Sequence, residues 1–188
     1  MNRVAEFERV SYMQFSAAVR DVFGISHAEE HIGFDEQDLR IGDTEQKLSD
    51  AFEAIQRPVR ATLGSAGYDI VSPFSFELSP GQTAKIPTGL RCRFTEPCWW
   101  LGIFPRSSLG FKYRAQLDNT VGVIDSDYYN ADNEGHIFIK ITNDSKSGQV
   151  LRVNRGDRFA QGIFIPYGIT MSDNAEGERT GGMGSTGK

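Results

Sequence analysis

The spacing of apolar residues along this chain changes once, close to Pro58. Before that point, five apolar residues recur at the three- or four-residue spacing of an amphipathic helix: Phe15, Ala18, Val19, Val22 and Phe23. Ser11 and Gln14 have the spacing of a capping box, and Gly24 ends the run. A second helical pattern occupies residues 48–55. We therefore predict a helical N-terminal extension over residues 1–57, with an acidic loop at 26–43.

From residue 60 onward the apolar period is two. Residues 74–78, 90–94 and 137–141 each alternate apolar and polar side chains, as half-buried strands do. Short strands separated by Gly, Pro, Asn and Asp turns indicate an all-β sandwich or barrel. Only residues 107–114 have the pattern of a short helix within this region. We predict a β-core over residues 58–171.

The last segment, residues 172–188, is rich in glycine and almost free of apolar side chains. Such a segment has little apolar surface to bury and is expected to stay flexible until a ligand orders it. We predict a Gly-rich C-terminal lid.

Composition narrows the class of protein. The chain has 188 residues with a net charge of −5, which argues against a broad nucleic-acid-binding surface. It has no apolar run near the roughly 18 residues of a membrane span and no signal-peptide pattern, so we expect a soluble, cytoplasmic protein. Cys92 and Cys98 are too few for a disulfide scaffold and are expected to be buried thiols.

Five short segments carry the candidate chemistry. They are SAGYDI at 65–70, PRSSLG at 105–110, NTVGVIDSDY at 119–128, GDRFAQ at 156–161 and RTGGMGSTG at 179–187. Each of these segments is a weak signal by itself, but their order and spacing give them weight together.

The residue types in these segments suit phosphate chemistry. Arg106 lies beside Ser107 and Ser108, which together supply a guanidinium fork, hydroxyls and backbone donors for a phosphate. Asp125 ends an apolar strand-like run, where a rigidly held carboxylate suits a general base. The glycine-rich segment that begins at Arg179 can fold over an anion with many N–H donors.

All five segments, in this order, resemble the trimeric dUTPase family, and the resemblance spans residues 60–188. It implies a β-clip or jelly-roll fold and a homotrimer with active sites shared among the subunits. It also implies an enzyme, a dUTP diphosphatase that hydrolyses dUTP to dUMP and pyrophosphate. Mg²⁺ would be held by the substrate phosphates rather than directly by the protein, in keeping with how this ion is commonly bound.

The resemblance also implies a role for individual residues. Asp125 would be the catalytic base that activates a water for attack on the α-phosphorus. Asn119 and the backbone of the following hairpin would read uracil, and the Tyr128 ring would lie under the deoxyribose and exclude a 2′-hydroxyl. Asp69 would be a supporting residue. The residues implied to contact the phosphates are Arg106, Ser107, Ser108 and Gln161.

The lid residues would come from a neighbouring subunit: Arg179, Ser185 and Thr186 would close over the γ-phosphate. The chain departs from the family pattern at Met183, where members usually have a phenylalanine that stacks on uracil. The fifth segment is also one residue shorter than in many members, and residues 129–134 lengthen the hairpin after Tyr128.

Two other functions are consistent with parts of the sequence. A dCTP deaminase, or a bifunctional dCTP deaminase/dUTPase, would use Glu134 of the Glu134-Gly135-His136 run to activate water at the cytosine ring. A nucleotide-sensing binding module would use the N-terminal extension to hold a partner. His27 and His31 are spaced as a metal pair on a helix, but the sequence offers no convincing third ligand, so we expect surface histidines.

Overall fold

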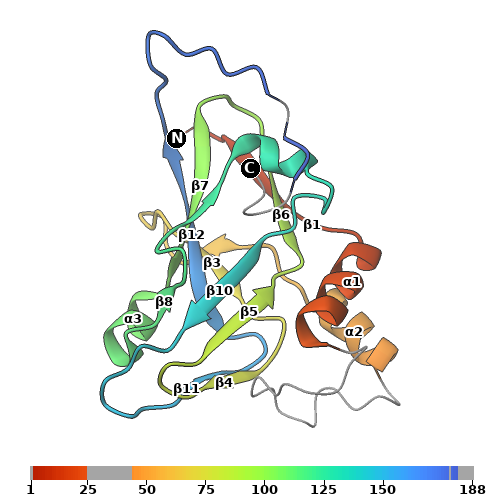
Figure 1. Cartoon of the computed structure of the whole chain (residues 1–188), viewed down its shortest axis with the longest axis vertical. Coiled ribbons are helices and arrows are strands. Elements are labelled where there is room, and N and C mark those ends of the chain that lie inside the picture. The colour runs from red at the N-terminus through yellow and green to blue at the C-terminus, as the bar shows by residue number, and fades with distance from the viewer. Residues whose placement is uncertain (1, 25–43, 178, 182–188) are drawn as a thin grey trace.

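The structure is a computed structural model, and it describes residues 2–24, 44–177 and 179–181 (Figure 1). Its largest sheet has the strand order β2-β3-β12-β7-β9 and is antiparallel throughout. These strands are β2 (Val59–Arg60), β3 (Tyr68–Val71), β12 (Arg158–Pro166), β7 (Trp99–Pro105) and β9 (Gly122–Ile124). β7 and β12 are the longest strands of this sheet, so they set the relative positions of everything attached to its edges.

Smaller antiparallel sheets complete the β-core. β5 (Thr83–Pro87), β10 (Phe138–Thr142) and β8 (Gln116–Leu117) form one sheet. β11 (Leu151–Val153) pairs with β4 (Phe76–Leu78), and β1 (Ala5–Arg9) pairs with β6 (Leu90–Phe94). A short helix, α3 (Ser107–Tyr113), follows β7, and a 3₁₀ helix, η2 (Ser126–Asn130), follows β9. The all-β class predicted from the two-residue period is confirmed, as is the short helix after β7.

The period-two runs place their apolar residues in the core as predicted. Ile137, Ile139 and Ile141 are all at most 1 % exposed, while Lys140 between them points outward. Phe76 and Leu78 on β4 are also buried, with Glu77 exposed between them. A half-buried strand needs this alternation because successive side chains point to opposite faces.

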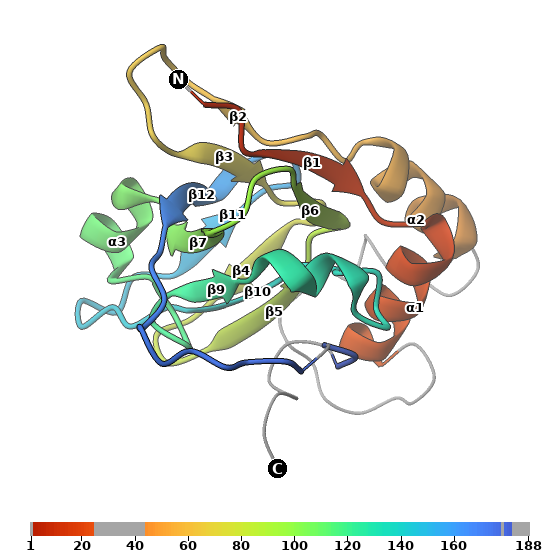
Figure 2. The same cartoon turned by 90° about the horizontal axis from the view of Figure 1, so that it is seen from above.

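The N-terminal region contains two helices, but it begins with a strand that the apolar spacing did not predict. α1 (Tyr12–Phe23) starts at Ser11, whose hydroxyl accepts a hydrogen bond from the Gln14 N–H at 3.1 Å, and ends at Gly24 with φ 60°. α2 (Thr44–Glu53) lies against α1 at one side of the molecule (Figure 2). Residues 5–9, however, are not helical: they form β1, a β-strand paired with β6.

The extension packs into the same apolar core as the β-strands. Phe15 of α1 stacks on Phe74 with ring centroids 5.9 Å apart, and Leu48 of α2 is 1 % exposed. Gly89, which precedes β6, has φ 70° and lies so close to Ile55 that a Cβ there would meet its side chain at 2.2 Å. The packing of α1 and α2 against the β-strands thus crosses the predicted boundary at residue 57. The boundaries at residues 57 and 171 stay predictions.

The two cysteines differ in their surroundings. Cys92 is buried and burial raises the pKa of its thiol to about 12, but Cys98 is exposed, so the expectation of two buried thiols was wrong for Cys98. Cys98 occupies a turn between β6 and β7, where its φ is 62°. The acidic loop at 26–43, with His27 and His31, lies outside the described residues. None of the described helices is both long and apolar enough to cross a membrane.

Candidate active site

Strand pairing brings three of the five segments to one end of the large sheet. Asp69 on β3 pairs in register with Gln161 on β12, and Pro105 at the end of β7 pairs with Ala160. Arg106 follows Pro105 directly and leads into α3, which carries Ser107 and Ser108 in its first turn. These residues form what we call the arginine cluster: Asp69, Arg106, Ser107, Ser108, Arg158 and Gln161.

Asp69 is the centre of the arginine cluster. Its side chain is only 10 % exposed, and it forms ion pairs with Arg106 Nε at 3.5 Å and Arg158 Nη1 at 3.2 Å. Gln161 Nε2 donates to the Pro105 carbonyl at 3.3 Å. Gly67 approaches Gln161 so closely that a Cβ would lie 2.5 Å from its Oε1. The cluster therefore presents two partly exposed guanidinium groups beside the hydroxyls of α3, a donor set suited to phosphate oxygens.

Arg158 was missed by the sequence reasoning, although it lies within the fourth segment. Its side chain is half exposed, and its partner Asp69 is the acid of the first segment. A β-bulge between Arg158 and Ala160 shifts the register at this point, so a simple alternation of faces along β12 does not predict its direction.

Asp125 lies at the other end of the large sheet. It follows the buried Ile124 of β9 and occupies the N-cap position of η2. Its carboxylate is 52 % exposed and accepts a hydrogen bond from Arg179 Nη1 at 2.8 Å. Asp127 accepts a second from the same nitrogen at 3.3 Å. Asp125 thus combines a fixed backbone with a solvent-accessible carboxylate.

Tyr128 is part of the same group and is held from several sides. It is 1 % exposed, its hydroxyl donates to the His136 carbonyl at 2.7 Å, and Asn133 Nδ2 donates to that hydroxyl at 2.8 Å. The Arg179 guanidinium lies 5.0 Å from the centre of its ring. Asp125, Tyr128 and Arg179 together are called the carboxylate group below.

Arg179 lies against Asp125 and Tyr128 of its own chain in the described structure, and its predicted reach into a neighbouring subunit stays a prediction. Its side chain is 9 % exposed, covered by the ring of Tyr128 and flanked by two carboxylates. Burial alone would lower the pKa of Arg179, but the hydrogen bonds to Asp125 and Asp127 outweigh it, and the net shift is upward. The guanidinium therefore stays charged, and a negatively charged ligand would have to compete with these carboxylates for it.

A pocket of about 380 Å³ lies at the turn between β8 and β9 and is linked to the carboxylate group through Asn133. Asn119 lines it at the turn between β8 and β9, together with Asn133, which also binds the Tyr128 hydroxyl. The turn is tight: Thr120 has φ 64°, and a Cβ at Gly122 would lie 3.0 Å from Ile103 Cβ. Backbone groups of this turn can therefore approach a flat ring closely, with the Asn119 side chain beside them.

The predicted site residues form two groups that are separated along β7. Leu101 of β7 pairs with Ile124, which precedes Asp125, and Arg106 lies five residues farther along the chain. Five residues of an extended strand span about 16 Å. Groups that act on one phosphorus must lie within hydrogen-bond reach of it, near 3 Å. The backbone positions from which Arg106 and Asp125 extend are therefore well separated within one chain.

The remaining predicted residues fall into two classes. Met183, Ser185 and Thr186 lie outside the described residues. Glu134 is described, and its carboxylate accepts hydrogen bonds from the Ser11 N–H at 2.8 Å and the Ser11 hydroxyl at 2.6 Å. It therefore faces the N-terminal region rather than the Asn119 pocket, which removes the feature that favoured a deaminase.

A buried histidine packs directly behind Tyr128. His136 is 0 % exposed, and its Nε2 accepts a hydrogen bond from the Gly89 N–H at 2.8 Å. Burial lowers its pKa to about 4, against a smaller opposing effect of Glu134. The imidazole is therefore neutral at pH 7 and serves packing rather than proton transfer.

The described residues contain no group of three or more His, Cys, Asp or Glu side chains that could hold a metal ion. Mg²⁺ commonly takes one or two carboxylates together with substrate phosphates. The arginine cluster contains the carboxylate of Asp69 beside donors suited to phosphates, and Asp125 is half exposed at the other end of the sheet. These residues fit an ion that arrives with a phosphorylated ligand.

Comparison with known proteins identifies a common family. The family model for dUTPase matches residues 53–187. The deoxyuridine 5′-triphosphate nucleotidohydrolase of Lactococcus lactis is 42 % identical over 136 residues, covering 71 % of this chain and 89 % of its own. The crystal structure of dUTPase from Streptococcus mutans has a TM-score of 0.53 and 39 % identity, covering 61 % of this chain and 88 % of its own. A mutant dUTPase from phage phi11 of S. aureus, described with a structural Mg(II) ion, shares the fold at TM-score 0.52 and 22 % identity, covering 65 % of this chain and 90 % of its own.

Proposed function

The chain belongs to the dUTPase family and is a dUTP diphosphatase, and we propose that its reaction is the attack of an Asp125-activated water on the α-phosphorus of dUTP. The products would be dUMP and pyrophosphate. The observation that carries this mechanism is the position of Asp125: a half-exposed carboxylate at a strand end, in one group with Tyr128, whose hydroxyl is bound by the pocket residue Asn133. A general base must reach the proton that it removes, and a strand end holds it there.

The pocket at the β8–β9 turn supports recognition of the base. Uracil O4 accepts a hydrogen bond where cytosine N4 donates one, so fixed backbone donors and acceptors discriminate the two rings. Asn119 would add a side-chain contact from the same turn. The ring of Tyr128 would lie under the deoxyribose and leave no room for a 2′-hydroxyl.

The arginine cluster supports binding of the triphosphate. Arg106, Ser107, Ser108 and Gln161 would contact phosphate oxygens, and Arg158 adds a second guanidinium. Asp69 would orient both arginines, because it is buried between them. In-line displacement at phosphorus requires positioning and neutralisation of charge, which these side chains supply. Mg²⁺, bound with the phosphates, would neutralise further negative charge on them.

The separation of the two groups supports an assembly with shared sites. Since the backbone positions of Arg106 and Asp125 are separated by about 16 Å along β7, we expect a complete site to combine the arginine cluster of one subunit with the carboxylate group of another. A homotrimer in which each site combines parts of different subunits satisfies this requirement. Such a homotrimer would need neither a nucleic-acid partner nor a membrane for its activity.

The C-terminal lid would complete the site after dUTP binds. Arg179, Ser185 and Thr186 would donate hydrogen bonds to the γ-phosphate, and Met183 would cover the base. For this to happen, Arg179 must leave Asp125, which it binds in the described chain. Release of Arg179 would at the same time free the Asp125 carboxylate to bind water.

One assay tests the proposed function. Purified protein is incubated with dUTP, dCTP, dTTP or UTP, with and without Mg²⁺, while pyrophosphate and ammonia are measured. We expect Mg²⁺-dependent pyrophosphate release from dUTP alone and no ammonia from dCTP. The variant Asp125→Asn keeps its shape but loses the proton acceptor, so its turnover should fall by a factor on the order of 10²–10⁴ with near-normal dUTP binding. Turnover close to wild type would exclude Asp125 as the base.

A further inference from the structure

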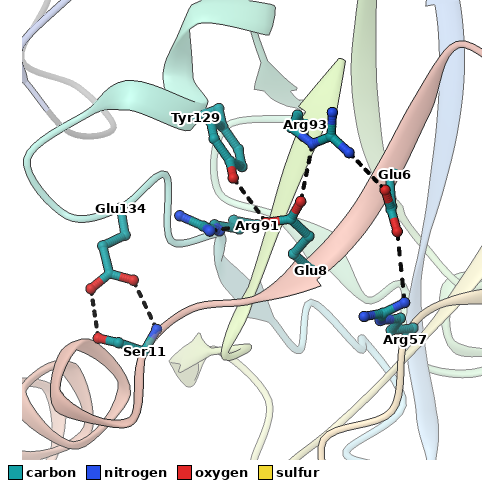
Figure 3. Close-up of polar contacts among 8 residues, drawn as sticks. All are labelled: Glu6, Glu8, Ser11, Arg57, Arg91, Arg93, Tyr129 and Glu134. Atoms are coloured by element: carbon teal, nitrogen blue, oxygen red, sulfur yellow. Dashed lines mark hydrogen bonds and ion pairs between the residues drawn. The ribbon is translucent and has the colours of Figure 1, made fainter. Parts of the chain in front are cut away.

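The N-terminal segment contacts the loop that follows η2 through two hydrogen bonds to one carboxylate. Glu134 Oε2 accepts from the Ser11 N–H at 2.8 Å, and Oε1 accepts from the Ser11 hydroxyl at 2.6 Å (Figure 3). The same hydroxyl accepts from the Gln14 N–H and caps α1. Burial would raise the pKa of Glu134, but these hydrogen bonds outweigh it and lower the pKa, so the carboxylate is ionised at neutral pH.

A second contact joins β1 to η2 itself. Glu8 Oε2 accepts from the Tyr129 hydroxyl at 2.9 Å and forms an ion pair with Arg91 on β6 at 2.9 Å (Figure 3). The Arg91 guanidinium lies 4.4 Å from the centre of the Tyr129 ring, and Arg93 holds the other oxygen of Glu8 at 3.1 Å. Glu8 and Arg91 are only 23 % and 25 % exposed, so solvent weakens this pair less than it weakens a fully exposed one.

We define the N-terminal clamp as these two contacts, Glu134 to Ser11 and Tyr129 to Glu8. Both contacts connect the N-terminal segment to residues that follow Asp125 and Tyr128 closely in the chain. Tyr129 is adjacent to Tyr128. Glu134 is linked to Asp125 by consecutive backbone hydrogen bonds: the Glu134 N–H to the Ala131 carbonyl at 2.8 Å, the Ala131 N–H to the Tyr128 carbonyl at 3.1 Å, and the Tyr128 N–H to the Asp125 carbonyl at 3.2 Å.

The backbone at Glu134 supports the same interpretation. Glu134 has φ 58° and Gly135 has φ 69°, so two successive residues are left-handed. That conformation is unfavourable for glutamate and persists where surrounding contacts hold it. A Cβ at Gly135 would lie 2.8 Å from both the Tyr128 carbonyl oxygen and the Tyr129 Cα, so this turn packs directly on η2. A displacement of Glu134 would therefore move the backbone that carries Tyr128.

We propose that the N-terminal clamp positions the segment 125–135, and that Glu134 and Glu8 are thereby positioning residues for hydrolysis and for selection of the deoxyribose. The proposal rests on the proposed roles of Asp125 and Tyr128. It gives the first eleven residues, which precede the region matched by the dUTPase family model, a function within the reaction. Glu134 is ionised for this purpose, and its carboxylate acts through Ser11 rather than on the nucleotide.

The test uses variants that remove single contacts from the full-length protein. Glu134→Gln keeps the side-chain length but retains only one acceptor for the two Ser11 donors, and Tyr129→Phe removes one hydrogen bond and keeps the ring on Arg91. Glu77→Gln is the matched control, because Glu77 forms an ion pair with Arg152 at 2.5 Å between β4 and β11, outside the clamp. Misplacing a catalytic group by about 1 Å can cost 10²-fold in rate, so we expect kcat for dUTP to fall on the order of tenfold in each clamp variant.

Three measurements separate positioning from simple stabilisation. We expect the clamp variants to lower kcat more than they change KM, and to raise UTP turnover relative to dUTP, because Tyr128 shifts with the loop. Ser11→Thr, which keeps the hydroxyl, should retain activity that Ser11→Ala loses. Clamp variants that lose melting temperature but keep the wild-type kcat and sugar preference would overturn the proposal, as would a control that loses as much activity as they do.

Hydrogen exchange gives a readout that does not depend on turnover. Amides of residues 126–135 should exchange faster in Glu134→Gln than in the wild type or the Glu77→Gln control; unchanged exchange would refute the clamp even if activity fell. If the wild type fails to hydrolyse dUTP, or Asp125→Asn retains turnover, the proposed function fails, and exchange still decides whether the clamp orders this loop.

Discussion

Three carboxylates near the candidate site differ in what holds them, and their surroundings distinguish their roles. Asp69 is buried between two arginines, and Glu134 accepts two hydrogen bonds from Ser11. Asp125 is half exposed, and its partner Arg179 comes from the segment that would move on closure. A base must exchange its partner for a water, and of these three carboxylates Asp125 is the one that is itself half exposed to solvent.

Tyr128 has a structural and a selective role, which two substitutions should separate. Tyr128→Phe keeps the ring but removes the hydrogen bonds with His136 and Asn133, which should cost on the order of 1–3 kcal/mol of stability. It should retain the preference for dUTP over UTP. Tyr128→Leu removes the ring and should raise the relative turnover of UTP. Kinetics with both nucleotides, together with thermal unfolding, measure the two effects; an unchanged preference in Tyr128→Leu would mean that another group excludes the ribose.

His136 should make folding stability depend on pH. Burial lowers its folded pKa to about 4, so between pH 4 and its unfolded value near 6.5 the unfolded chain binds more protons. The contribution of the neutral His136 to the free energy of unfolding is therefore fully present above pH 6.5 and is lost as the pH falls toward 4. It amounts to on the order of 3 kcal/mol in all. Denaturant unfolding of the wild type and His136→Gln across this range should show a shallower pH slope in the variant. Parallel slopes would contradict the assignment.

At the scale of single residues, the family resemblance implied that Arg106 and Gln161 bind phosphate and that Asp69 supports them. Two neighbouring strand pairs bring these three residues together, while their roles stay predictions. The sequence could not show that Arg179 would lie on Asp125 of the same chain, because that contact joins residues 54 positions apart. Nor did it show Asn133 in the pocket wall, since residues 129–134 carry no strand or helix period.

Among the elements, the period-two strands were predictable and β1 was not. Alternation identified β4, β6 and β10 because each has one buried and one exposed face. In the β1 region the buried residues are Val4, Phe7 and Val10, spaced three apart. That spacing imitates one face of a helix, while the true determinant is pairing with β6, from Ala5 opposite Phe94 to Arg9 opposite Leu90. Non-local pairing of this kind overrides the local pattern.

The C-terminal lid should be dispensable for folding and necessary for turnover. Removing residues 179–188 takes little apolar surface from the core, so the melting temperature should stay close to that of the wild type. The truncation also deletes the guanidinium on Asp125 and the proposed donors to the γ-phosphate, so most hydrolysis should be lost. Arg179→Gln, which retains the rest of the lid, should lose part of that activity. A fully active truncated enzyme would refute the role of the lid.

For the whole molecule, the length of β7 is the main constraint on assembly. β7 is a single strand paired on both sides, with β12 and β9, so its two ends cannot approach each other without breaking both pairings. The arginine cluster and the carboxylate group are consequently fixed apart within one chain. The homotrimer is the arrangement proposed to bring two chains together at each site.

Mixing two inactive variants tests that arrangement directly. Asp125→Asn damages only the carboxylate group, and Arg106→Gln damages only the arginine cluster, so each homotrimer should have no intact site. If each site combines these groups from two different subunits, co-refolding equal amounts should restore about a quarter of the wild-type sites, because random mixed trimers pair an intact Asp125 with an intact Arg106 at that frequency. dUTP turnover of the mixture measures the recovery, and each variant refolded alone is the control. A site built within one chain would give no recovery at any ratio, because every chain would then carry one damaged group.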